Sequence, residues 1–358
     1  MKKLLLASAV AALSVSAANA APTIYGKAFI TTDYVNGEID RAGTTDDYDA
    51  NSLQINSNGS RIGFKGSEAM TANTDVVYQL EYGTSVDGDG ASFKNRDTYL
   101  GLANKNLGEF RFGNNSSVLG YINNVAVNQG YWDNLGTTRL EDEKQAQPLN
   151  MADETRINSS IVWLAPKYNG MPLELALMYG ADEKFVEDSD DRKNGYGASL
   201  MFDQGTGLTA GLAYTKDLDA EGQYMLGTEP TKVGGDIVRG TLSYDMSKMI
   251  AAPVKVGVLY QQTDYDYDGA KKEKGLVVSG EMGLTNFARP AAVYAQYNKT
   301  DNLNGVDDAK SDQLVVGGKY MYKNNMIMHA YAGANSADIG GNTDADVFAI
   351  GGGLEYKF

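Results

Sequence analysis

Apolar and polar residues alternate with a period of two through most of the chain. In the C-terminal segment, Phe348, Ile350, Leu354, Tyr356 and Phe358 share one face, while small and charged residues occupy the other. The same alternation recurs at residues 173–179, 196–202, 208–215, 254–261 and 276–282. A two-residue period predicts β-strands, because successive side chains of a strand point to opposite faces.

The second face of these strands distinguishes between two all-β architectures. It consists largely of Gly, Ala, Ser and Thr, with an occasional Lys, Glu or Arg. The outer face of a soluble β-sandwich would carry many long polar side chains, since its apolar face turns inward. A membrane barrel instead turns its apolar face to lipid, with aromatic girdles at both boundaries. The pattern therefore favours a transmembrane antiparallel β-barrel.

The spacing predicts sixteen strands joined by connections of alternating length. Tight turns occupy 105–108, 204–207 and 323–325, whereas longer, acidic loops occupy 182–193, 218–235, 265–274 and 301–311. An even number of strands with short turns at one end and long loops at the other is the barrel layout. The predicted strands are 23–35, 51–66, 74–86, 93–104, 108–114, 155–165, 171–181, 194–203, 207–217, 236–246, 253–264, 275–286, 291–300, 312–322, 325–335 and 345–358.

The first twenty residues have the pattern of a secretory signal. Lys2 and Lys3 precede an apolar run from Leu4 to Val15, and 18–20 is a small-x-small cleavage site. The run is too short for a membrane-spanning helix. We expect residues 1–20 to be removed and residues 21–358 to form a single barrel domain.

Composition narrows the classes further. The 358 residues include 41 Gly and 7 Pro and lack Cys, which excludes a disulfide framework and a thiol nucleophile. The formal charge of −15 becomes −17 once the two signal lysines are removed. An acidic chain with a pI near 4.6 argues against a nucleic-acid partner, because phosphate binding needs a basic surface.

The connection 115–154 is much longer than the other loops. It carries apolar side chains that suit packing into a larger structure: Val118, Leu119, Ile122, Val125, Trp132, Leu135 and Leu140. Loops of this length are usually functional or disordered. We interpret it as a loop that narrows a pore; the alternative is a surface excursion or a recognition loop.

Four motifs resemble the general diffusion porins of the Gram-negative outer membrane. They are 24–27 (IYGK), 60–68 (SRIGFKGSE), 97–102 (DTYLGL) with 108–113 (GEFRFG), and 354–358 (LEYKF). The resemblance implies a sixteen-stranded barrel, a homotrimer, and a third external loop folded into the lumen. It also implies that the outer-membrane assembly machinery reads the C-terminal Phe358.

The resemblance further implies a ladder of basic wall residues facing acidic residues of the long loop. The matching basic positions are Lys27, Arg61, Arg96 and Arg156. Strand parity turns Lys27, Arg61 and Arg156 inward. An inward Arg96 would turn Asp97 outward, which requires that Asp97 lie in a subunit interface or above the lipid, or that a bulge intervene. The acidic candidates are Asp133, Glu141, Asp142 and Glu143, among which the sequence does not choose, because the loop lacks the Pro-Glu-Phe-Gly-Gly segment of well-known members.

Other functions are less consistent with the sequence. An enzyme would need a nucleophile and a base, yet the chain has a single histidine, His329, and lacks a G-x-S-x-G motif, so we interpret His329 as structural or interfacial. The acidic segment Asp264–Asp268 lacks the order of an EF-hand, and neither a metal nor another cofactor is expected.

We therefore expect a passive outer-membrane channel for small hydrophilic solutes and ions, with mild cation selectivity. Its other expected partners are outer-membrane lipid and lipopolysaccharide. A solute-specific channel or an outer-membrane adhesin on the same barrel is the alternative.

Overall fold

The computed structural model describes residues 21–41, 48–88, 93–133, 148–167, 171–181, 194–220, 234–249, 253–340 and 343–358. The predicted signal peptide lies outside them. The helices in the described part of the chain are short 3₁₀ turns, none of which is long and apolar enough to cross a membrane.

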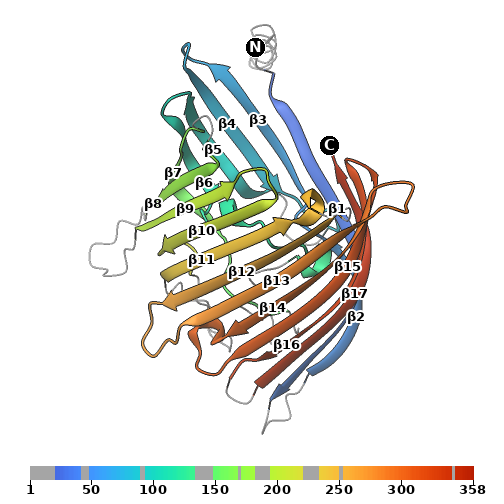
Figure 1. Ribbon diagram of the computed structural model, residues 1–358. Helices are drawn as coiled ribbons and strands as arrows, with labels where there is room; N and C mark the ends of the chain where they lie inside the picture. The colour runs from blue at the N-terminus through green and yellow to red at the C-terminus, as the bar shows by residue number, and fades with distance from the viewer. Residues whose placement is uncertain are drawn as a thin grey trace, which may run out of the picture.

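Antiparallel strands wrap into a closed barrel (Figure 1). The barrel closes where the first strand pairs with the last, from Lys27 opposite Lys357 to Arg41 opposite Thr343. The strands are β1 (Thr23–Arg41), β2 (Tyr48–Ser57), β3 (Arg61–Ala69), β4 (Thr74–Gly83), β5 (Lys94–Asn104), β6 (Gly108–Ser116), β7 (Arg156–Leu164), β8 (Leu173–Gly180), β9 (Gly195–Asp203), β10 (Leu208–Lys216), β11 (Gly235–Asp245), β12 (Val254–Tyr265), β13 (Glu273–Leu284), β14 (Ala291–Asp301), β15 (Lys310–Lys323), β16 (Met326–Asp338) and β17 (Thr343–Lys357).

The seventeen strand segments of the described residues occupy sixteen positions in the wall, as predicted. The expected strand 51–66 is divided into β2 and β3, which both pair with β1. The division falls at Gly59, whose φ of +58° is a left-handed conformation that interrupts a strand. β1 is also longer than expected, because its pairing with β2 and β17 continues beyond residue 35.

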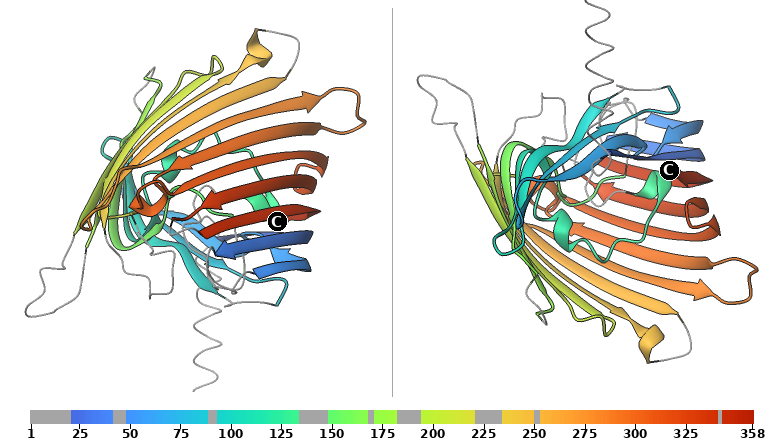
Figure 2. Two further views of the ribbon diagram at one scale, coloured as in Figure 1. Left: turned by 90° about the horizontal axis from the view of Figure 1, so that it is seen from below. Right: turned by 90° about the horizontal axis from the view of Figure 1, so that it is seen from above.

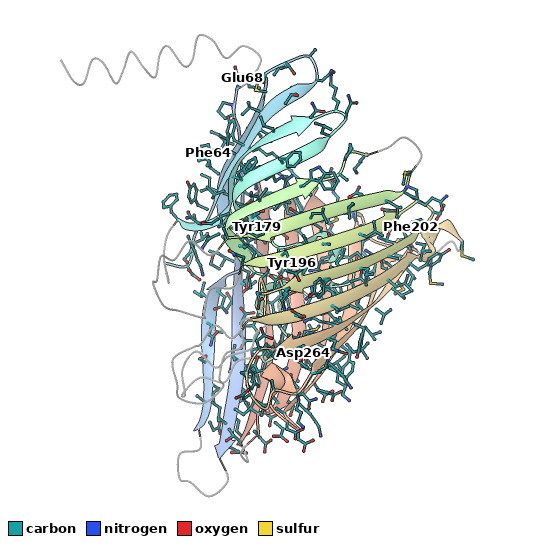
Figure 3. All side chains as sticks on the ribbon, turned by 90° about the vertical axis from the view of Figure 1, so that its left-hand side faces the viewer. Phe64, Glu68, Tyr179, Tyr196, Phe202 and Asp264 are labelled. Carbon is teal, nitrogen blue, oxygen red and sulfur yellow. The ribbon has the colours of Figure 1, made fainter. Side chains whose placement is uncertain are left out.

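The outer surface of the barrel carries the predicted apolar face. Leu177, Leu212, Val258 and Ile350 are among the exposed apolar side chains. Tyr179 of β8 lies opposite Tyr196 of β9, and both rings point outward at one end of their strands (Figure 3). These positions suit an apolar band bounded by aromatic side chains.

The chain ends meet in a tight junction. The backbone nitrogen of Gly26 donates to the carbonyl of Phe358 at 2.9 Å, and the nitrogen of Phe358 donates back at 3.1 Å. A Cβ atom at Gly26 would overlap the Phe358 ring and lie 2.7 Å from the carbonyl oxygen of Arg61. Only glycine therefore fits where the last side chain crosses the first strand.

The described parts of the loop between β6 and β7 lie inside the ring of strands (Figure 2). They include two short 3₁₀ turns, η1 (Gly120–Ile122) and η2 (Gly130–Trp132). The predicted apolar anchors are buried against inward-facing wall residues: Val118, Leu119, Ile122, Val125 and Trp132. Leu135 and Leu140 lie outside the described residues.

Trp132 illustrates how this loop meets the wall. Its ring is fully buried next to Gly333 of β16, and its Nε1 donates to the carbonyl of Ala349 at 3.3 Å. The backbone nitrogen of Tyr131 donates to the Tyr331 hydroxyl at 3.0 Å. The loop is thus attached to strand residues that are 200 and 217 positions away in the sequence.

Candidate functional site

A polar cavity of about 260 Å³ lies between the loop and one side of the barrel wall. Its charged lining residues are Lys27, Arg61, Arg96, Arg156, Asp133, Asp153 and Glu154. The four predicted basic residues therefore meet around one space, together with one of the four predicted acidic candidates. Glu141, Asp142 and Glu143 lie outside the described residues.

The basic side of the cavity comes from four separate strands. Lys27 is on β1, Arg61 begins β3, Arg96 is on β5 and Arg156 begins β7. These four cations are partly buried and repel one another. They would be poorly stabilised if they had no acidic neighbours. Two carboxylates of the wall provide those neighbours for the three arginines.

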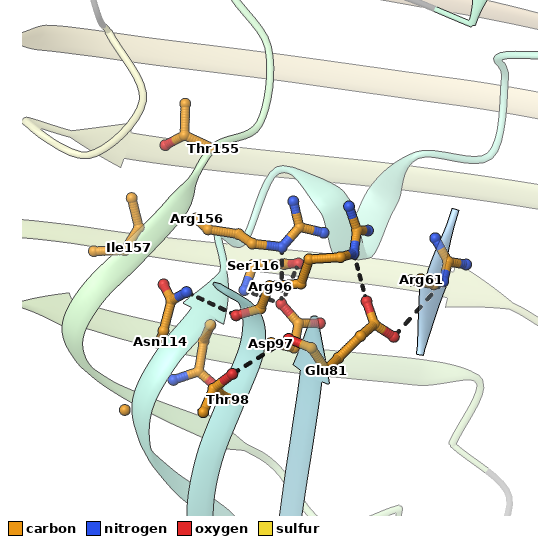
Figure 4. A network of polar contacts seen from close by, with 12 residues as sticks. Arg61, Glu81, Arg96, Asp97, Thr98, Asn114, Ser116, Thr155, Arg156 and Ile157 are labelled. Carbon is orange, nitrogen blue, oxygen red and sulfur yellow. Dashed lines mark hydrogen bonds and ion pairs between the residues drawn. The ribbon is translucent and has the colours of Figure 1, made fainter. Parts of the chain in front are cut away.

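Glu81 of β4 is the first of these carboxylates (Figure 4). Its Oε1 accepts a hydrogen bond from Arg96 Nε at 2.6 Å, and its Oε2 lies 3.7 Å from Arg61 Nε. Tyr25 also donates to Glu81 at 3.0 Å. Glu81 thus holds two arginines side by side and offsets part of their repulsion.

Asp97 of β5 is the second carboxylate. Its Oδ1 lies 3.3 Å from Arg156 Nε and accepts hydrogen bonds from the backbone and hydroxyl of Ser116 (Figure 4). Arg96 and Asp97 both face the interior although they are adjacent in sequence. The pairing of β4 with β5 explains this, because it advances two residues on β4 between Leu80 and Tyr82 but three on β5. The bulge considered as an explanation for Arg96 is therefore present.

A second irregularity lies between β6 and β7. Ser160 pairs with Gly113 but Ile157 pairs with Asn115, so β7 also contains an extra residue, and Ser159 has a φ of +50°. As a result Ile157, which parity placed on the lipid face, packs into the interior apolar cluster around Val118. Arg156 lines the cavity beside it.

The acidic side of the cavity comes from the loop. Asp133 directly follows η2, and Asp153 and Glu154 precede β7. Burial raises the pKa of Asp133, while the nearby Lys27 acts in the opposite direction. Burial and the neighbouring Asp153 raise the pKa of Glu154 to about 7, partly opposed by Arg239 and Arg156. Glu154 therefore changes charge near neutral pH.

Four carboxylates of this charged network were not among the predicted site residues: Glu81, Asp97, Asp153 and Glu154. Glu81 had a usable signal, because it alternates with the outward-facing Leu80 and Tyr82 and so shares the parity of the lumen. Asp153 and Glu154 lie at the end of the predicted loop, but nothing in their spacing separates them from the other acidic residues. The inward orientation of Asp97 could be predicted only with knowledge of the bulge in β5.

His329 takes part in a different contact. It is buried, and its Nε2 lies 2.9 Å from Glu355 Oε2; the centroid of its ring lies 4.8 Å from that of the Phe29 ring. Within the described ranges, no group of three or more His, Asp or Glu side chains is arranged to hold a metal ion.

Comparison with known proteins identifies the family to which this barrel belongs. A family model described as Gram-negative porin matches residues 7–239, which is more than half of the chain. The chain belongs to this porin family. It is a β-barrel protein of the bacterial outer membrane.

Curated relatives of this porin match it from end to end. Outer membrane protein S2 of Salmonella typhi is 27% identical over 403 residues, and the major outer membrane protein P.IB of Neisseria sicca is 25% identical over 376 residues; each match covers 100% of both chains. Among solved structures, an anion-selective porin from Comamonas acidovorans has a TM-score of 0.65 at 18% identity, with 95% of this chain and 100% of that chain covered. That likeness shows a shared fold. The relatives are channel-family proteins rather than enzymes.

Proposed function

We propose that this porin is a water-filled channel for passive diffusion of small hydrophilic solutes and ions, and that the charged cavity is its constriction. The observation that carries the proposal is the opposition of four basic wall residues to three loop carboxylates around about 260 Å³ inside the barrel. Opposed charges across a narrow aqueous space create a transverse field that orients water and polar solutes. An apolar solute is disfavoured because it must displace that ordered water.

We infer that the channel is mildly cation-selective. The charges at the constriction nearly balance, since the arginines pair with Glu81 and Asp97 and the loop supplies Asp133, Asp153 and Glu154. The mature chain carries a net charge of −17, derived from −15 by removal of two signal lysines, and many of its acidic residues lie in the predicted external loops. Field lines from those loops raise the local cation concentration at the entrance.

The assembly is proposed to be a homotrimer inserted by the outer-membrane assembly machinery. Family membership supports both statements, and the C-terminal Phe358 is half exposed at the seam between β1 and β17. The apolar outer face supplies the surface that lipid, lipopolysaccharide or a second subunit would cover.

Purified protein in a planar lipid bilayer tests the proposal. We expect discrete, ohmic conductance steps and, across a KCl gradient, a reversal potential of the sign for cation preference. Folded and boiled samples should migrate differently on a gel, because a closed barrel resists detergent unfolding. Absence of conductance steps from heat-modifiable protein would refute the channel, and a reversal potential of opposite sign would refute the cation preference.

A further inference from the structure

The acidic end of the loop is held on its N-terminal side through the backbone N–H and carbonyl of Ala152, and on its C-terminal side by Thr155, which donates to Asp219. The backbone nitrogen of Ala152 donates to Glu273 Oε1 at 3.0 Å, and its carbonyl accepts from Gln261 Nε2 at 2.6 Å. The next residue, Asp153, forms a 2.7 Å ion pair with Arg239. Asp153 and Glu154 line the cavity directly after this attachment, so their positions depend on it.

Glu273 is an unusual residue to find at this attachment. Its side chain is fully buried at the start of β13. Besides Ala152, its donors are the Thr263 hydroxyl at 3.2 Å, the Tyr265 hydroxyl at 3.1 Å and the backbone nitrogen of Asn304 at 2.9 Å. All four donors are neutral groups. Burial of a carboxyl is unfavourable without such partners, so the side chain is fixed by the groups that compensate it.

The two oxygens of Glu273 face different parts of the molecule. Oε1 receives the bonds from Ala152 and Thr263, whereas Oε2 receives those from Tyr265 and from Asn304 in the 3₁₀ turn η4 (Leu303–Gly305). Only Oε1 reaches the loop, through Ala152, whereas the Asn304 backbone nitrogen holds Oε2 at the barrel wall whether or not the Tyr265 hydroxyl is present. Gln261 and Arg239 continue the polar row along neighbouring strands through a 2.7 Å hydrogen bond.

We propose that Glu273 is a positioning residue for the charge selectivity of the pore: by binding the Ala152 peptide it keeps Asp153 and Glu154 at the cavity. The inference rests on the proposed channel function and adds a residue that does not line the cavity. Its physical basis is the distance dependence of electrostatic interactions. The attraction between a carboxylate and a passing ion falls with distance, and salt screening with a Debye length of about 10 Å at 0.1 M makes it fall faster, so an outward displacement of a few ångströms weakens ion selection.

Two substitutions separate position from charge. Glu273→Asp keeps the carboxyl but shortens the side chain by one methylene, so it cannot reach both Ala152 and Asn304. Glu273→Gln keeps the length but replaces one acceptor oxygen by a donor, which then faces a backbone N–H. Tyr265→Phe is the matched control, because it removes one donor to Oε2 and leaves the Ala152 bond in place.

The absence of Cys from the chain allows a direct rescue. A Cβ built at Gly275 lies 3.0 Å from the Cβ of Met151, about 0.5 Å below the spacing of about 3.5–4.5 Å usual for disulfides, so the loop has to move outward by only that amount to accommodate the bond. The pair Met151→Cys and Gly275→Cys would therefore tie the loop to β13 one residue before Ala152. The pair is placed in the parent and in both Glu273 variants, and each protein is measured oxidised and after reduction.

Reversal potentials in 0.1 M KCl gradients are the readout, with heat-modifiable migration as the check on folding. For Glu273→Asp and Glu273→Gln we expect the cation-to-anion permeability ratio to fall about two- to threefold, while Tyr265→Phe keeps the parent ratio. Oxidation of the cysteine pair should restore the ratio in both variants, and reduction should abolish the rescue. Folded Glu273 variants with the parent ratio would overturn the inference, as would a fall that the disulfide leaves unchanged. Absence of any conductance in the parent would overturn the proposed function and this inference with it.

Discussion

Replacement of Arg96 by Ser perturbs the constriction at its most tightly paired cation. Arg96 lines the cavity and binds Glu81 at 2.6 Å, whereas Arg61 lies 3.7 Å from the same carboxylate. The substitution removes one positive charge and leaves Glu81 with Tyr25 and the more distant Arg61. The field at the cavity should therefore become more negative, and selectivity should move toward cations.

The size of the change follows from the dimensions of the cavity. A space of about 260 Å³ places an ion at its centre roughly 7 Å from the lining charges. One unit charge at about 7 Å in water interacts by about 0.6 kcal/mol, which screening at 0.1 M salt reduces to about 0.3 kcal/mol. Because cation and anion respond with opposite signs, the permeability ratio should change about threefold. At 1 M salt, where the Debye length is about 3 Å, the change should nearly vanish.

Reversal potentials of parent and Arg96→Ser channels at 0.1 M and 1 M KCl measure this effect. Lys319→Ser is the matched control, because Lys319 is also a wall cation with a carboxylate partner, Glu281 at 2.6 Å, but does not line the cavity. We expect a much smaller change in the control. Equal changes in both variants, or a change that persists at 1 M KCl, would refute the reasoning from local charge.

Three further changes test other parts of the site. Raising the pH from 6 to 8 should increase cation preference, because Glu154 loses its proton near a pKa of about 7. Reversal potentials measure this change. A Glu154→Gln channel with an undiminished pH response would contradict the assignment of the titration to Glu154. Glu81→Gln should shift the permeability ratio toward anions by about threefold at 0.1 M KCl, opposite to Arg96→Ser, and a cation shift would contradict it. Gly333→Val should displace Trp132, because Cε2 of Trp132 lies 2.7 Å from the new Cβ, and should thereby raise single-channel conductance in a barrel that is still heat-modifiable. Gly240→Val is the control, because its Cβ meets nothing within 4 Å. Equal conductance in the two variants would exclude loop displacement.

The architecture was predictable because alternate residues of each barrel strand face the lipid and the lumen, which gives the sequence a period of two. The parity that exposes Ile350 and Leu354 to lipid also places Lys27 and Arg61 toward the lumen. Parity failed where the wall is irregular. The extra residue of β5 allows Arg96 and Asp97 to face the same side, and the extra residue of β7 turns Ile157 inward. A bulge changes the period locally, and nothing in these short segments marks its position.

The division of β2 from β3 has the same origin. Asn58 and Gly59 read as tolerable residues within a strand, yet Gly59 adopts a left-handed conformation there. A glycine within a strand is compatible with either outcome, so the sequence predicted the strand but not its interruption.

The loop was harder to predict than the wall. Its apolar anchors identified a packed segment, but the choice among its carboxylates depends on contacts with distant strands. Asp153 is oriented by Arg239, 86 residues away, and Ala152 by Glu273, 121 residues away. Such long-range pairings leave no local pattern, which is why Asp153 and Glu154 were missed although both lie within the predicted loop.

Covalent modification of a single cysteine tests most directly whether the cavity lies on the ion path. Since the parent chain lacks Cys, Arg61→Cys supplies one reactive side chain at the cavity lining. Addition of a bulky methanethiosulfonate reagent during single-channel recording should reduce the current in discrete steps, reduction should restore it, and the parent channel should not respond. Complete modification, verified by mass, with unchanged single-channel current would show that ions do not pass through this cavity.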